Sequence, residues 1–124
     1  MPSYILLAAI MVVGVCLAPS AEAGFVSGAD LLGICSPAKV DPVYRLKVAE
    51  CRGYVIGVAD TFDCSNPATE FTWNSETSVT QEGLVVAVVK WLRKNPQNLR
   101  YQANNLVAAA LSTEFPCSRQ ESKN

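Results

Sequence analysis

The stretch over residues 43–62, VYRLKVAECRGYVIGVADTF, constrains the fold of this chain more than any other part of the sequence. Its apolar side chains recur at steps of three and four residues, a spacing that places them on one face of a helix. That face consists of Tyr44, Val48, Cys51, Val55, Ala59 and Phe62. Asp41 and Pro42 stand just before the stretch, where they predict an N-cap and a first helical position. We therefore expect a central core helix here.

Gly53 and Gly57 lie four residues apart inside this predicted helix. Each glycine costs roughly 1 kcal/mol relative to alanine in a helix interior. Their spacing leaves a flat strip along which another helix can approach closely. Because residues 54–59 are apolar on nearly every side, we expect neighbouring helices to cover this end. A ligand groove along the glycines is the alternative, although the strip has no polar side chain to anchor a ligand.

Residues 1–23 have the pattern of a secretory signal peptide. The apolar run over residues 5–17 is too short to span a bilayer comfortably, and Ala21-Glu22-Ala23 is the small-x-small pattern that signal peptidase accepts. Residues 1–4 contain no lysine or arginine, so an uncleaved anchor is the alternative. Cleavage after Ala23 predicts an exported mature chain that begins at Gly24.

The predicted mature chain has no net charge. The sequence contains ten basic and eleven acidic residues, and the loss of Glu22 leaves ten of each. It has no basic block of the kind that binds nucleic acid and no cationic face for a membrane surface. We therefore expect no nucleic acid partner and, after signal cleavage, no membrane partner. The length of 124 residues suits one domain, which we place at residues 24–117, followed by a flexible polar tail over residues 118–124.

Four cysteines remain in the predicted mature chain: Cys35, Cys51, Cys64 and Cys117. An even number in an exported chain predicts two disulfides. The sequence has no histidine, which excludes a mixed zinc site, and the wide cysteine spacing disfavours a four-cysteine site. We expect no metal and no cofactor.

The cysteines allow three pairings, and we favour Cys35 with Cys117 and Cys51 with Cys64. Nine helical residues after Cys51 travel about 13.5 Å. Four extended residues return about 13 Å, so a bridge from Cys51 to Cys64 is feasible but taut. The alternative pairing, Cys35–Cys51 with Cys64–Cys117, would tie the first helix to the central one.

Three further helices are predicted around the central one. A capping box at Ser27 and Asp30 begins a short helix over residues 29–34, and a second at Ser78 and Gln81 begins another that ends at residues 93–96. The valine-rich run over residues 85–89 is compatible with a buried strand, but the flanking cap and terminator favour a helix. The last helix is expected over residues 101–114. The residues expected to face the core are Leu31, Leu32 and Ile34; Leu84, Val85, Val88, Val89, Trp91 and Leu92; and Ala103, Leu106, Val107, Ala110 and Leu111.

Residues 63–77 form the least regular part of the sequence, and Phe71 and Trp73 are its two aromatic residues. One interpretation is that both rings fold back onto the core as a lid. The other is that they are partly exposed and anchor a partner protein, because aromatic residues dominate binding hot spots. On the second interpretation we predict a partner-binding site at Phe71, Trp73, Glu70 and Asn74.

Catalysis is not expected. Without histidine there is no Ser-His-Asp or Cys-His system, and paired cysteines leave no thiolate. Asp60 and Asp63 are the one close carboxylate pair, and we interpret them as the solvated end of the central helix.

Four blocks of the sequence resemble the Tai-type immunity proteins of bacterial type VI secretion. They are F-x-x-G-x-D-L-L-x-x-C at residues 25–35, C-x-G-Y-V-x-G-V-x-D at residues 51–60, a T-Q opening and W-L…N-P ending at residues 80–96, and A-x-x-L-V-x-x-A-L…F-P-C at residues 103–117. The family's Phe-Cys-x-Pro element is replaced here by Phe71-Thr72-Trp73-Asn74. The resemblance implies a periplasmic, disulfide-linked helical domain, often a homodimer. It also implies binding and blocking of a cognate effector such as a peptidoglycan amidase.

The predicted fold class is therefore all-α, a small disulfide-braced bundle of four helices similar to periplasmic HdeA-like domains. That similarity also supplies the alternative function, a stress-related periplasmic helper or acid chaperone. Such a protein would loosen and expose apolar surface at low pH, when its carboxylates become neutral together.

Overall fold

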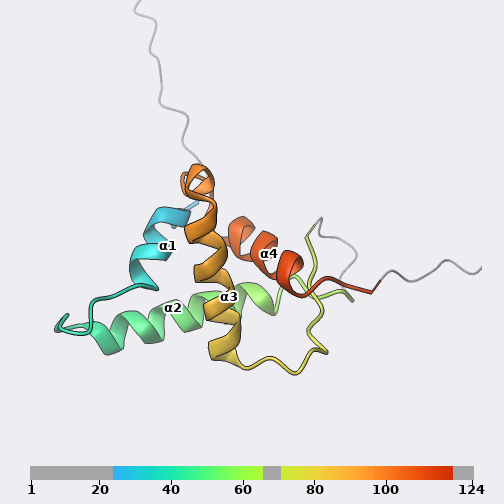
Figure 1. Cartoon of the computed structure of the whole chain (residues 1–124), viewed down its shortest axis with the longest axis horizontal. Coiled ribbons are helices and arrows are strands. Elements are labelled where there is room, and N and C mark those ends of the chain that lie inside the picture. Colours follow the sequence, from blue (N-terminus) through green and yellow to red (C-terminus); the bar gives the residue numbers. More distant parts are fainter. Residues whose placement is uncertain (1–23, 66–70, 119–124) are drawn as a thin grey trace, which may run out of the picture.

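The computed structural model describes residues 24–65 and 71–118. The predicted signal peptide, Glu70 and nearly all of the predicted tail lie outside these residues. The described chain contains four α-helices: α1 (Gly28–Ile34), α2 (Tyr44–Ala59), α3 (Gln81–Lys94) and α4 (Ala103–Glu114). A short 3-10 helix, η1 (Pro96–Asn98), connects α3 to α4 (Figure 1). The described residues form no strand beyond two isolated bridges, which confirms the predicted all-α class.

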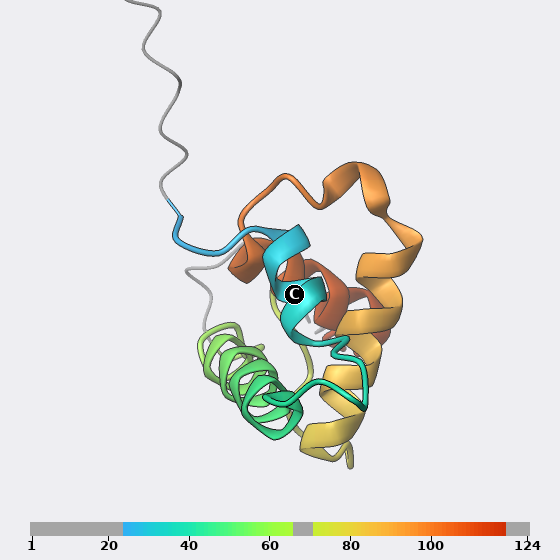
Figure 2. The same cartoon turned by 90° about the vertical axis from the view of Figure 1, so that its left-hand side faces the viewer.

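The core lies where α4 meets the other three helices. Seen from the end at which α1 lies, α2 and α3 flank α1 and α4 runs behind it (Figure 2). All five residues of α4 that were predicted to face inward are buried. They pack against Leu31, Cys51, Val55, Ala59, Trp73, Leu84, Val88 and Leu92. No polar or charged side chain is buried in the described part of the chain, so the core is held by apolar packing.

The predicted capping box of α1 is confirmed. The Ser27 hydroxyl accepts a hydrogen bond from the Asp30 N–H at 3.2 Å, and the Asp30 carboxylate accepts one from the Ser27 N–H at 3.0 Å. Gly28 is required by close packing, because a Cβ atom there would lie 2.4 Å from Leu106 Cδ1 and 3.0 Å from Leu99 Cα. The Gly28 N–H also donates to the Tyr101 carbonyl at 2.9 Å, so α1 is fastened to the segment before α4.

The predicted start of α2 is wrong. The helix begins at Tyr44, and its N-cap is Val43, which makes no side-chain capping bond. Asp41 instead accepts a hydrogen bond from the Val43 N–H at 2.9 Å and pairs with Lys47 Nζ at 2.7 Å. Asp41 therefore closes a turn before the helix, and Pro42 lies in that turn rather than in the first helical position.

The first half of α2 projects from the bundle (Figure 1). Val48, predicted to face the core, is 40% exposed, and Leu46 is 65% exposed. The core face of α2 is thus limited to Cys51, Val55 and Ala59, because neighbouring helices reach only the second half.

The glycine strip of α2 is not covered by another helix, contrary to expectation. A Cβ atom added at Gly53 or Gly57 would meet nothing within 4 Å. Gly53 lies two residues from both Cys51 and Val55, so it points away from the buried face of the helix. Both glycines therefore face outward, on the side opposite the core.

The helical prediction for the valine-rich segment is confirmed, but the cap is not the predicted one. Thr80 is the N-cap of α3, and its hydroxyl accepts a hydrogen bond from the Gly83 N–H at 3.0 Å. The predicted capping box at Ser78 is therefore wrong, and the N-cap lies two residues later. Ala87 is buried although it was not predicted, whereas Val85, Val89 and Trp91 are only partly buried.

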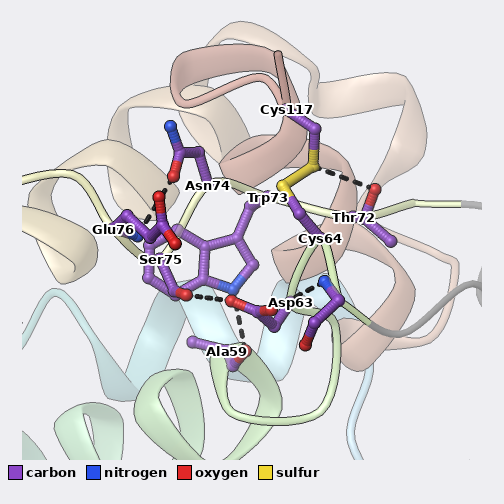
Figure 3. Close-up of a disulfide and its surroundings, with 10 residues drawn as sticks. Ala59, Asp63, Cys64, Thr72, Trp73, Asn74, Ser75, Glu76 and Cys117 are labelled. Carbon is purple, nitrogen blue, oxygen red and sulfur yellow. Dashed lines mark hydrogen bonds between the residues drawn. A yellow bond between two sulfur atoms is a disulfide. The ribbon is translucent and has the colours of Figure 1, made fainter. Parts of the chain in front are cut away.

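The disulfides are Cys35–Cys51 and Cys64–Cys117, so the favoured pairing is wrong and the alternative is found. Cys35 is the C-cap of α1 and lies 5.0 Å, Cα to Cα, from Cys51 on the buried face of α2. Cys64 donates its N–H to the Trp73 carbonyl at 3.1 Å. Asn74 in turn donates to the Phe115 carbonyl at 2.8 Å, which brings Cys117 to Cys64 (Figure 3).

Removing either disulfide should destabilise the domain by an amount that follows the length of the closed loop. The bridges join residues 16 and 53 positions apart. We expect Cys35→Ala/Cys51→Ala to lower the free energy of unfolding by about 2–4 kcal/mol, and Cys64→Ala/Cys117→Ala by about 1 kcal/mol more. Urea unfolding of the two double variants measures both. Non-reducing peptide mapping is the control, and a fragment that links Cys51 to Cys64 would contradict this fold.

Acid should weaken the domain only below about pH 4. The Ser27 hydroxyl and N–H hold the pKa of Asp30 below its ordinary value of 3.8. Lys47 and the Val43 N–H do the same for the pKa of Asp41, as the Ser65 side chain and N–H do for the pKa of Asp63. Because these pKa values fall on folding, the resulting stability is complete above the ordinary value and is lost as pH falls below it and through the lowered pKa.

The urea midpoint should therefore be equal near neutral pH and at about pH 5, and lower at about pH 3. Asp30→Asn should show a smaller acid effect than the unmodified protein. Without urea, the far-ultraviolet circular dichroism should stay helical at about pH 3, because no charged group in the described core becomes protonated. Loss of that spectrum in acid would favour the acid-chaperone alternative.

Candidate partner-binding surface

Trp73 belongs to the core, which corrects its predicted exposure. Its side chain is 6% exposed, and its indole Nε1–H donates to the Ala59 carbonyl at the end of α2 at 2.7 Å (Figure 3). Its ring packs edge-on against Phe115, with centroids 6.3 Å apart. Trp73 is thus a lid residue, as the first interpretation of the loop predicted.

Asn74 and Asp63 hold the loop together. Asn74 Oδ1 accepts a hydrogen bond from the Glu76 N–H at 3.0 Å. The Asp63 carboxylate accepts hydrogen bonds from the Ser65 N–H at 2.7 Å and from the Ser75 hydroxyl (Figure 3). Asp63 is therefore a loop anchor, whereas Asp60 is exposed at the end of α2, as interpreted from the sequence. Glu70 lies outside the residues that the structure describes, Trp73 is buried and Asn74 is partly buried. Phe71 is therefore the one predicted partner-binding residue that the structure shows exposed.

Phe71 lines a groove of about 620 Å³ on the outer side of α4, which we name the aromatic groove. Trp91 of α3 and Tyr101 from the connection before α4 supply two more aromatic walls. Phe71 and Tyr101 are 41% and 44% exposed, and Trp91 is partly buried. The polar lining consists of Asn98, Gln102, Asn105, Ser112 and Thr113.

None of the residues that line the aromatic groove is charged. Interface centres in protein complexes have the same character, because they are depleted of charge and enriched in aromatic residues. One pattern in the sequence does indicate this groove. Residues 103–113 of α4 carry no charge, although Asn105 and Thr113 are exposed to solvent. The sequence pattern predicts Trp91 in the core and Tyr101 at the start of the last helix. It therefore does not predict that either residue lines a binding site.

The described residues contain no group of three side chains suited to a metal ion, and none of their helices is long and apolar enough to cross a membrane. All four cysteines of the predicted mature chain lie in disulfides. An uncharged, aromatic, open groove is suited to packing against another molecule.

The family model of the Rap1a immunity proteins matches residues 27–117, from the N-cap of α1 to the last cysteine. The chain belongs to this family. Rap1a immunity proteins are an immunity-protein family of type VI secretion and are generally non-enzymatic. The predicted resemblance to type VI immunity proteins is thus confirmed at the level of the family. A comparison with curated proteins gave no significant match.

Phe71 and Trp73 should differ sharply when each is replaced by alanine. Trp73→Ala removes a buried ring and a hydrogen bond to α2, so we expect a loss of about 3–5 kcal/mol in the free energy of unfolding. Phe71→Ala removes an exposed ring and should change it by less than about 0.5 kcal/mol. Urea unfolding followed by circular dichroism measures both. Equal losses would show that Phe71 is also a core residue.

Proposed function

We propose that this Rap1a family protein is a periplasmic immunity protein that binds a cognate type VI effector and blocks it by occlusion. The observation that carries the proposal is the family match over residues 27–117. Occlusion is favoured over catalysis because the sequence has no histidine and the disulfides use all four cysteines of the predicted mature chain.

The proposed effector is a peptidoglycan amidase, the class implied by the resemblance to Tai-type proteins. Such an enzyme meets its substrate outside the cytoplasmic membrane, so its inhibitor must be exported. The predicted signal peptide over residues 1–23 supports export. The two disulfides agree with an oxidising compartment.

The proposed contact with the effector is the aromatic groove, with Phe71 as its anchor. The ring of Phe71 stays outside the core, while Trp73, two residues further along the chain, fixes the loop to α2. An anchored loop reduces the entropy lost on binding, because less of the chain has to be ordered in the complex. The amide and hydroxyl side chains around the groove would form the polar rim of the interface.

A homodimer is part of the proposal, and the outer side of α2 is the surface we assign to it. Leu46 is 65% exposed there, and the space above Gly53 and Gly57 is open. The glycines each cost the helix roughly 1 kcal/mol and gain no contact within the described chain. A helix of a second copy can approach closely at this strip.

Effector capture tests the proposal. The mature, oxidised protein is immobilised and exposed to proteins secreted by bacteria with active type VI systems. We expect recovery of a peptidoglycan amidase in stoichiometric amount, together with loss of its activity in the complex. Phe71→Ala should weaken binding at least about tenfold, because aromatic anchors at an interface centre contribute about 1.4 kcal/mol or more.

Val40→Ala is the matched control, since Val40 is 91% exposed and lies on the loop between α1 and α2. It should bind like the unmodified protein. Failure to capture any cell-wall hydrolase, or capture without inhibition, would contradict the proposed function. Light scattering on the protein alone tests the dimer separately, and a monomer would contradict only that part.

A further inference from the structure

A second groove, of about 440 Å³, lies on the outer face of α3 beside the disulfide at the end of α1. We name it the valine groove. Its apolar floor is formed by Val85, Val86 and Val89, and its rim by Lys90, Arg93 and Lys94.

Part of the floor is apolar surface left in contact with solvent, although Val85 also packs against the core. Val86 is 65% exposed, and Val85 and Val89 are partly buried. Valine is also a poorer helix former than alanine, because its branched side chain loses rotamer freedom in a helix. Covering these side chains with another molecule would be favourable, because it removes apolar surface from water. The helix is therefore better suited to a covered outer face than to a solvated one.

The rim holds three positive charges without a carboxylate among the residues that line the groove. The ion pairs within residues 24–65 and 71–118 are Lys47–Asp41 and Arg52–Glu82, and neither includes a rim residue. Arg93 Nη2 donates to the Ser36 hydroxyl at 3.2 Å, which positions the guanidinium against the end of α1 without neutralising it. The dipole of α3 favours Arg93 and Lys94 in its last turn, but it does not account for the exposed Val86.

We propose that the valine groove docks an acidic segment of the effector, with carboxylates on the cationic rim and an aliphatic side chain over Val86. The inference rests on the proposed function and adds a contact separate from the aromatic groove. Charge complementarity selects the occupant: the groove carries three cations around an apolar floor. Arg93 suits a bidentate carboxylate contact, and the two lysines act as point charges. Such pairs mainly raise the association rate and the specificity of binding.

Three synthetic amphipathic helical peptides test the chemistry of the groove on the mature, oxidised protein. They share one leucine face and carry glutamate, glutamine or lysine on the other face. By fluorescence anisotropy, we expect the glutamate peptide to bind at least about tenfold tighter than the other two at low ionic strength. Its Kd should rise with added salt, since exposed charges are screened.

Lys90→Glu/Lys94→Glu should weaken binding of the glutamate peptide at least about tenfold. Val86→Ser should weaken it less, by about threefold, without changing its salt dependence. The matched control is Lys39→Glu/Arg45→Glu, which makes the same change in net charge at exposed positions near the start of α2. This control should bind like the unmodified protein. A single-stranded DNA oligonucleotide tests whether any polyanion suffices, and it should bind more weakly than the glutamate peptide.

Equal binding of the glutamate and glutamine peptides would overturn the inference, as would tighter binding of the DNA or an equal loss in the control variant. The captured effector separates this inference from the proposed function. If the effector associates equally fast with the unmodified protein and with Lys90→Glu/Lys94→Glu, the groove assignment fails and the immunity function stands. If the unmodified protein captures no effector, the proposed function fails, and the groove assignment that rests on it fails too.

Discussion

The fold depends on the burial of α4, which has six buried residues, more than any other described helix. Val107 and Leu111 are completely buried, and Leu106 nearly so. No side chain caps the N-terminus of α4, and its only charged residue is Glu114 at the end. Its stability must therefore come from packing rather than from local interactions. The backbone bond from the Ala103 N–H to the Val26 carbonyl, 2.9 Å long, holds its first turn against the segment before α1.

The disulfides and Trp73 brace the elements that surround this helix. One disulfide joins the end of α1 to the middle of α2, and the other joins the loop after α2 to the chain just beyond α4. Between the two disulfides, the Trp73 indole donates a hydrogen bond to the last turn of α2. A loop fixed at these points can display Phe71 at a defined place on the surface. The candidate site is thus supported by the same contacts that complete the core.

Helix α3 contributes to both grooves because consecutive helical residues point about 100° apart. Trp91 lines the aromatic groove, and its neighbour Lys90 stands on the rim of the valine groove. The first groove has an uncharged lining and the second a cationic one. An aromatic contact and a charged contact contribute differently to recognition, since the first mainly slows dissociation and the second mainly speeds association. Two such surfaces joined through one helix suit a protein that recognises one partner.

The sequence by itself determined the features that depend on neighbours three or four residues away. It predicted the helices, the inward residues of α4 and the Ser27–Asp30 capping box, because helical periodicity and capping bonds are local. Only the tertiary structure decided which cysteines pair, how much of α2 is covered, and that Trp73 is buried while Phe71 is exposed. Each of these depends on contacts between segments far apart in the chain, such as Cys64 with Cys117 and Trp73 with Ala59. Local spacing carries no information about such distances, because they are set by how the helices pack.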